Sequence, residues 1–218
     1  MILPEDVPSN PIFSHLQKLS PNEVARLSLT CDYAKHDYIV LENDLATHVH
    51  IIVDGIAKCV KTSPKGRSVT LKLLFKGDTF SSKAYPGSIQ AISNVRILKI
   101  NFATFSKIIF ENGELALQWG YFLATLLRQA HEAAAAFALY TAKQRLALVL
   151  LSIVKRAGTS TSGGIRLDFP LTRDELADLA GLTPDTTSRM LTQFRQERLI
   201  EGAPRSLLIR DMEGLQRV

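Results

Sequence analysis

Two kinds of hydrophobic pattern follow each other along the chain. From Asp37 to about Ile100, short runs rich in β-branched residues alternate with turn signals, as expected for an all-β unit. Glycine in the turns can supply the positive φ that tight connections need. This part of the chain therefore predicts a small barrel or roll. The expected strands are Tyr38–Leu41, Val49–Val53, Ala57–Val60, Val69–Phe75 and Val95–Ile100.

The period becomes helical from about Glu114. Apolar residues recur at spacings of three and four, and an alanine run at 133–136 continues the pattern; these residues are Leu115, Trp119, Phe122, Leu126 and Leu127. A helix of this length has more apolar surface than a small roll can cover. We therefore expect it to form the seam of a dimer. A helix buried within one chain is the alternative.

The remainder of the chain predicts a third part. A second helix is expected from about Ala142 to Arg156, and the glycine- and serine-rich stretch Gly158–Gly164 indicates a flexible loop. The predicted organisation is a roll at 1–113, a dimerisation helix at 114–140 and a C-terminal domain at 141–218. The predicted fold class is α+β.

Composition adds little to this division. The 218 residues carry a net charge of +5, which fits a nucleic-acid partner but does not require one. Lysine and arginine outnumber aspartate and glutamate by 14 to 12 through Thr141 and by 12 to 9 after it, so neither half holds the basic excess. The chain has no signal-peptide pattern and no apolar run of the roughly 20 residues that a membrane span needs. We expect a soluble cytoplasmic protein without a membrane partner.

The strongest motif lies between Leu171 and Ile200. Thr172 can cap a short helix together with the glutamate three residues later, and Gly181 can end that helix in the left-handed conformation. Thr183 can then cap a second helix, with Pro184 in its first turn. The pattern predicts two helices joined by a tight turn, and a hairpin that serves packing alone is the alternative.

The second helix of this motif carries the candidate chemistry. Four apolar residues of this motif are expected in the core, Leu182, Met190, Leu191 and Phe194. This leaves polar positions facing outward, where a DNA major groove would meet them. Arg189 is the expected base reader, because a guanidinium can donate two hydrogen bonds to O6 and N7 of guanine.

The spacing Thr-Arg-x-Glu-Leu-Ala-x-x-x-Gly-Leu-Thr-x-x-Thr-x-Ser-Arg at 172–189 resembles the helix-turn-helix of the Crp/Fnr family of transcription regulators. A short wing at 199–210 follows it, and upstream turns such as Lys76-Gly-Asp78 resemble the family's cyclic-nucleotide-binding-like β-roll. The resemblance implies a winged helix-turn-helix and a homodimer that binds palindromic double-stranded DNA, with RNA polymerase as a further partner. The DNA-binding residues that it implies are Thr172, Arg173, Thr183, Asp185, Thr186, Ser188, Arg189, Gln193 and Arg205.

One recognition position departs from the family pattern. The family usually has glutamate where this chain has Asp185, and that glutamate both accepts a bond from cytosine and braces the arginine. Aspartate is one methylene shorter, so the half-site, in the style of TTGA or GTGA, stays open. Ser188 beside Arg189 resembles the Fnr branch more than the cAMP-receptor branch.

The effector is a separate question. The family's cyclic-nucleotide binders have a glycine–glutamate pair for the ribose and an arginine–serine pair for the phosphate, whereas the segment Thr79–Ala91 has serines near the first pair and no arginine. A buried phosphate would lack its cationic partner, so we expect no cAMP binding. The expected effector pocket consists of Phe80, Ser81, Ser82, Lys83, Ser88 and Thr125.

Other sensor chemistries follow from the remaining residue types. Two cysteines, Cys31 and Cys59, cannot supply the four thiolates of an iron–sulfur cluster. A redox switch at either cysteine is a less favoured hypothesis than a haem sensor. Haem stays open because one axial histidine suffices. His48 and His50 share a strand face and could chelate a metal, although packing is the favoured interpretation. The histidines are His15, His36, His48, His50 and His131.

Two alternatives to the main interpretation remain at this point. One is a haem- or redox-dependent gas sensor of the same family. The other is a cyclic-nucleotide-like module that regulates a protein partner without binding DNA. An enzyme is not expected, because the chain has no phosphate-binding glycine motif, no nucleophile elbow and no metal-ligand spacing.

Overall fold

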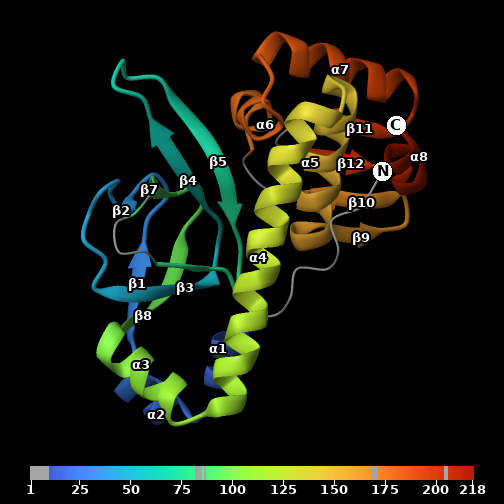
Figure 1. The fold of residues 1–218 in the computed structure, drawn as a ribbon. Coiled ribbons are helices and arrows are strands. Elements are labelled where there is room, and N and C mark those ends of the chain that lie inside the picture. Colours follow the sequence, from blue (N-terminus) through green and yellow to red (C-terminus); the bar gives the residue numbers. More distant parts are fainter. Residues whose placement is uncertain (1–9, 82–84, 86, 168–170, 204–205) are drawn as a thin grey trace. The chain divides into compact units, whose positions relative to one another are not determined.

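The computed structural model describes residues 10–81, 85, 87–167, 171–203 and 206–218 (Figure 1). The described residues divide into two compact units, 10–128 and 129–218. The first unit contains two sheets and the second contains one, and each unit has its own buried side chains.

The first unit is a β-roll with short helices, and all five expected strands are confirmed. Its eight strands form two four-stranded antiparallel sheets, in the orders β1-β8-β3-β6 and β2-β7-β4-β5. The strands are β1 (Leu29–Tyr33), β2 (Tyr38–Val40), β3 (His48–Asp54), β4 (Ala57–Thr62), β5 (Ser68–Leu74), β6 (Thr79–Phe80), β7 (Ser88–Ala91) and β8 (Val95–Asn101). The helices are α1 (Pro11–Leu16), α2 (Pro21–Leu27) and α3 (Phe102–Phe110).

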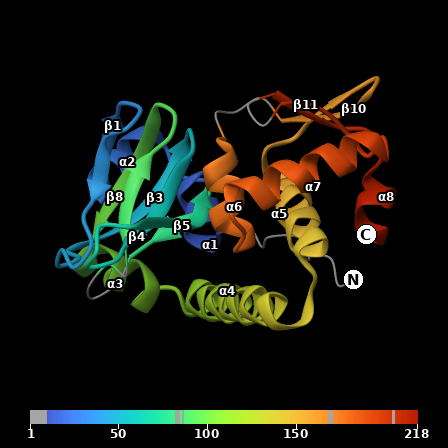
Figure 2. The ribbon, with the colours of Figure 1, turned by 90° about the horizontal axis from the view of Figure 1, so that it is seen from above.

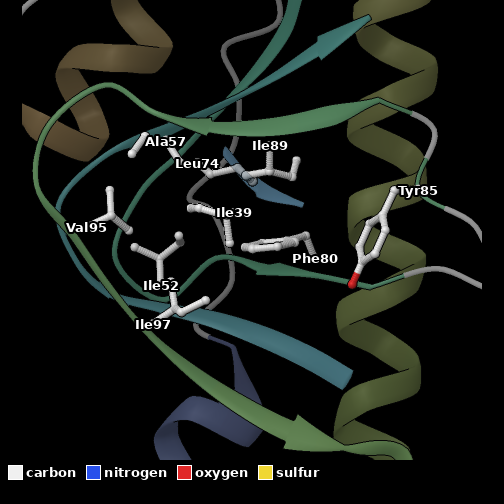
Figure 3. Close-up of a cluster of buried hydrophobic side chains, with 10 residues drawn as sticks. Ile39, Ile52, Ala57, Leu74, Phe80, Tyr85, Ile89, Val95 and Ile97 are labelled. Carbon is white, nitrogen blue, oxygen red and sulfur yellow. The ribbon is translucent and has the colours of Figure 1, made fainter. Parts of the chain in front are cut away.

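The interior of the roll is filled by aliphatic and aromatic side chains. Ile52 and Ile97 from the first sheet pack with Leu74 and Ile89 from the second, and Phe80 joins the same cluster (Figure 3). Successive residues of a strand point to opposite faces of the sheet, so the residues next to these in β3 and β8 point away from the roll interior.

Neighbouring positions in the same strands serve a second core. Ile51 precedes Ile52, and Leu98 follows Ile97, so both face the other side of their sheet. There they pack against Ile12 and Leu16 of α1. Both Ile51 and Ile52 are fully buried. The sheet that contains β3 and β8 is therefore covered on both faces, which explains its continuous apolar runs.

Helix α4 (Gly113–Leu139) confirms the long helix expected after the roll. Its 27 residues begin in the first unit and end in the second. Only Leu115 and Phe122 among its described side chains are buried. Many of its apolar residues are therefore exposed in the single chain.

The second unit contains α5 (Ala142–Ala157) and a four-stranded antiparallel sheet in the order β11-β12-β10-β9. The flexible loop expected at 158–164 is wrong. Residues there form most of a hairpin, because β10 pairs with both β9 and β12. Gly164, at a φ of +133°, lies so close to Ile209 that a Cβ would be 2.1 Å from its carbonyl oxygen. The strands are β9 (Thr159–Thr161), β10 (Gly164–Leu167), β11 (Ile200–Ala203) and β12 (Ser206–Ile209).

Three more helices complete this unit: α6 (Arg173–Ala180), α7 (Pro184–Gln196) and α8 (Met212–Arg217). Helix α7 runs along the outside of the unit, beside α6 (Figure 2). Within the described residues, no helix is both long and apolar enough to cross a membrane.

Candidate nucleic-acid interface

Helix α6 begins with the capping box that the sequence predicted. The Thr172 hydroxyl accepts a hydrogen bond from the backbone N–H of Glu175 at 3.1 Å, and the Glu175 carboxylate accepts one from the Thr172 backbone N–H at 2.9 Å. Two amide groups that the first turn would otherwise leave without partners are therefore satisfied. This start positions Arg173 at the exposed beginning of the helix.

The turn after α6 depends on Gly181, which adopts the left-handed conformation with φ 61° and ψ 45°. The backbone geometry favours glycine, and a Cβ at this position would lie 2.2 Å from the ring of Phe137, so any other residue would have to displace that ring. The guanidinium of Arg145 donates hydrogen bonds to the carbonyl oxygens of Ala180 at 2.8 Å and of Tyr140 at 3.0 Å. Arg145 thereby joins α5 to the end of α6.

Helix α7 begins at the predicted cap as well. The hydroxyl of Thr183 accepts from the backbone N–H of Thr186 at 3.2 Å. The buried face consists of Thr187, Leu191 and Phe194, each at most 1% exposed. These side chains anchor α7, and the polar residues between them face outward. Leu182 and Met190, which were also expected in the core, are only partly buried, and Met190 lines a shallow depression beside Arg189.

Two hydrogen bonds organise the outward face. The Arg189 guanidinium donates to the Thr186 hydroxyl at 3.3 Å, and the Arg173 guanidinium donates to the Ser188 hydroxyl at 3.5 Å. Arg189 and Asp185 are exposed. The side chain that holds Arg189 in this structure is therefore Thr186. Asp185, which stands where the family usually has glutamate, is the residue before it.

The structure brings most of the predicted DNA-binding residues into one surface. Thr172 and Arg173 begin α6, and the other described members lie at the cap or on the outward face of α7. Arg205 lies outside the described residues. Gln193 also lies on this side, and its amide donates to Glu197 at 2.9 Å.

Several residues of this surface were missed from the sequence. Thr192 and Gln196 are exposed and line the same shallow depression as Arg189. Their spacing of three and seven residues from Arg189 was the available signal. Arg195 donates to the Gly202 carbonyl oxygen at 2.9 Å and so ties α7 to the wing strand β11, an interaction for which the sequence has no local signal.

The described members of the expected effector pocket do not form a common polar site. Phe80 is buried in the roll core, Ser81 donates to the His48 carbonyl oxygen, and the Ser88 hydroxyl accepts from the backbone N–H of Glu42. Thr125, on α4, donates to the Tyr121 carbonyl oxygen. Ser82 and Lys83 lie outside the described residues.

A buried polar pair lies beside Phe80 and was not foreseen. His50 is 4% exposed and stacks on Phe80 with 4.8 Å between ring centroids. The hydroxyl of Tyr85 lies 3.1 Å from its Nδ1. Burial, and then the positive charge of Lys99, lower the pKa of His50 to about 4. Burial likewise raises the pKa of Tyr85 to about 12, so the pair is neutral.

The histidines do not gather in one place. His48 and His50 are neighbours, with ring centroids 6.2 Å apart, whereas His36 is exposed in the turn between β1 and β2 and His131 is exposed on α4. In the part of the chain that the structure describes, no group of three or more histidine, cysteine, aspartate or glutamate residues could hold a metal ion.

The roll, the long helix and the winged helix-turn-helix together define a class of DNA-binding transcription regulators. Sequence profiles of two domains match the chain: the cyclic nucleotide-binding domain at residues 30–112 and the Crp-like helix-turn-helix domain at residues 144–218. The chain belongs to the Crp/Fnr family of transcription regulators.

Proteins named as regulators are similar to this chain over most of its length. The nitrogen fixation regulation protein FixK of Azorhizobium caulinodans is 27% identical over 89% of this chain and 81% of its own. A CRP-like cAMP-activated global transcriptional regulator of Mycobacterium tuberculosis is 27% identical over 92% of this chain and 94% of its own.

Solved structures share the fold. FixK2 from Bradyrhizobium japonicum superposes with a TM-score of 0.78 at 24% identity, over 87% of this chain and 96% of that one. A CooA mutant from Carboxydothermus hydrogenoformans has a TM-score of 0.78 at 24% identity, over 94% of this chain and 93% of that one.

Proposed function

We propose that the protein is a homodimer that binds a two-fold symmetric DNA site and responds to an effector, other than cAMP, through its β-roll. The observation that carries this proposal is the outward face of α7. It is a capped helix, anchored by Leu191 and Phe194, that exposes Arg189 where a major groove can receive it. A module that served only a protein partner would not need this arginine.

Dimer formation is supported by a stripe along α4. Gly120, Leu123, Leu127, Ala130 and Ala134 follow each other at alternating spacings of three and four, and all are exposed in the single chain. This is the spacing of a coiled-coil seam, in which small residues let the helix backbones approach closely. Two copies joined by a two-fold axis would present two recognition helices to a palindrome.

The effector proposal is supported by the residues of the roll. Phe80 and Tyr85 occupy the interior together with Ile89 (Figure 3), and the hydroxyls of Ser81 and Ser88 are engaged by the backbone. No arginine stands between Thr79 and Ala91 to pair with a phosphate. These residues do not fit cAMP, although a relative carries cAMP activation in its name.

The remaining parts of the proposal follow from DNA binding. In a cell without a nucleus, a protein that binds the chromosome works in the cytoplasm. RNA polymerase is the second partner that the family resemblance implies. We propose no catalytic role and no iron–sulfur cluster. Haem is the alternative effector chemistry, since His48 and His50 lie in the roll.

Selection from a random pool of duplexes tests the proposal directly. The full-length protein should enrich a palindromic site whose half-sites are about 10 base pairs apart from centre to centre. The same pool incubated with the Arg189→Ala variant is the matched control. Recovery of random sequences by the wild-type protein would contradict the proposal and would favour the protein-regulating module.

A further inference from the structure

We infer that the β4–β5 hairpin is a second DNA-binding surface, which contacts phosphates outside the recognised palindrome. The inference rests on the proposed DNA-binding function and extends it to another part of the protein. The 23 residues from Gly55 to Gly77 contain six basic residues and no acidic one, whereas the whole chain has a net charge of only +5. The basic residues are Lys58, Lys61, Lys65, Arg67, Lys72 and Lys76.

The hairpin presents its charge at an exposed tip. Strands β4 and β5 pair from Ala57 opposite Leu74 out to Thr62 opposite Ser68, and the hairpin projects beyond the other strands of the roll (Figure 1). Every residue from 61 to 68 is exposed. The backbone N–H of Gly66 donates to the Ser63 carbonyl oxygen at 2.9 Å, which closes a tight turn.

Two of the cations at the tip, Lys65 and Arg67, are not neutralised within the part of the chain that the structure describes. Lys61 forms an ion pair with Glu42, which lies outside the hairpin. Among the described residues, neither Lys65 nor Arg67 has an acidic side chain within ion-pair distance. Two cations at the end of a projecting hairpin are therefore available to an anionic partner.

The chemistry of the tip favours nucleic acid over protein. Between residues 61 and 68 the side chains are basic or small, and two hydroxyls, those of Thr62 and Ser68, lie 2.9 Å apart. Phosphate groups are bound by lysine, arginine, serine, threonine and backbone N–H groups. Protein interfaces instead depend on buried aromatic or apolar anchors, and the tip has none.

Phosphate binding of this kind would add affinity without adding sequence preference. Each neutralised phosphate releases a counterion, which makes binding more sensitive to salt. Because the hairpin is part of the chain that binds the palindrome, a phosphate contact by it would be an intramolecular second step. The hairpin should therefore matter only when flanking DNA is present.

The test uses the full-length protein and two duplexes. One ends at the outer edges of the selected half-sites, and the other extends by roughly 20 base pairs, about two helical turns, on each side. We expect Lys65→Ala/Arg67→Ala to bind the long duplex at least about tenfold more weakly at low salt than the wild-type protein does. The slope of log affinity against log salt should become shallower by about 0.9 for each phosphate that the variant no longer neutralises. Binding to the short duplex should be unchanged.

Lys18→Ala/Lys35→Ala is the matched control, because it removes the same charge from exposed positions of the same unit. It should behave like the wild-type protein on both duplexes. Hydroxyl-radical footprints on the long duplex should show flanking protection that is absent with the hairpin variant. Equal melting temperatures of the two variants would show that both are folded.

Two results would overturn the inference. An unchanged salt slope for the hairpin variant on the long duplex would assign the basic tip to an acidic protein surface instead. Equal decreases in affinity for the hairpin variant and the control would indicate a general charge effect. Failure of the proposed function itself would look different, since the wild-type protein would then enrich no site at all.

Discussion

Arg189 combines exposure with a hydrogen bond that orients its guanidinium, and its removal should relax base selection. The bond to Thr186 positions the side chain without burying it. Removing a bidentate interaction with guanine should cost about 1–3 kcal/mol per half-site and flatten preference at one base pair. Binding of Arg189→Ala to a set of single-base variants of the selected site measures this effect.

Arg173→Ala is the matched control for that measurement. Arg173 begins α6 and is expected to bind phosphate, so its removal should weaken binding to all sequences alike and reduce the salt slope. Asp185→Glu, which restores the family's longer side chain, should strengthen selection for cytosine. Full preference at every position in Arg189→Ala would show that α7 does not read bases as proposed.

His50 should make the stability of the roll depend on pH. Its pKa is about 4 in the folded protein, against 6.5 when unperturbed, so the unfolded chain binds more protons between these values. The free energy of unfolding should therefore fall as pH falls from about 6.5 to about 4, by about 3 kcal/mol at most, and change little from this source below pH 4.

His50→Gln is the variant that isolates this effect. Glutamine does not titrate in this range and still offers an acceptor to the Tyr85 hydroxyl. Urea unfolding at several pH values should show a smaller loss of stability in His50→Gln than in the wild-type protein. The same pH dependence in both proteins would mean that other groups cause it.

At the scale of elements, the proposed dimer depends on helix α4. Leu127 is 58% exposed in the single chain and lies in the middle of the proposed seam, whereas Leu126 is half-buried. Leu127→Lys would bring two like charges together and should weaken association by at least about 30-fold, roughly 2 kcal/mol. Sedimentation at micromolar concentration measures the change.

Gln118→Lys supplies the control, since it adds the same charge on the opposite face of α4. It should leave the dimer intact and can pair with Glu114, to which Gln118 already donates. Equal association of the Leu127 and Gln118 variants would remove α4 as the seam, and with it the basis for palindromic recognition.

At the scale of the whole molecule, the effector should raise the stability of the folded protein. A ligand that binds only the folded state raises the melting temperature. We expect cAMP at physiological concentrations to change neither the melting temperature nor DNA affinity. Absorbance near the Soret region in freshly purified protein checks the haem alternative. A clear thermal shift with cAMP would contradict the interpretation of the Thr79–Ala91 segment.

The sequence alone predicted the helix caps, the turn and the long helix, because residues a few positions apart determine each of them. The caps at Thr172 and Thr183, the left-handed Gly181 and the helical period of α4 are each specified by residues a few positions apart. The structure shows each of them where the sequence predicted it. The family pattern in the same residues then led from the helix-turn-helix to the class of regulator.

Only the tertiary structure decided features made by residues far apart in the chain. The stretch at 158–164 became part of a hairpin because β12, more than 40 residues later, pairs with β10. His50 lost its usual pKa because Phe80 and Tyr85 bury it. The net charge of each half of the chain did not reveal the basic hairpin. Its basic residues form one surface because β4 and β5 pair. Long-range packing decides burial and charge clustering, and local spacing does not encode it.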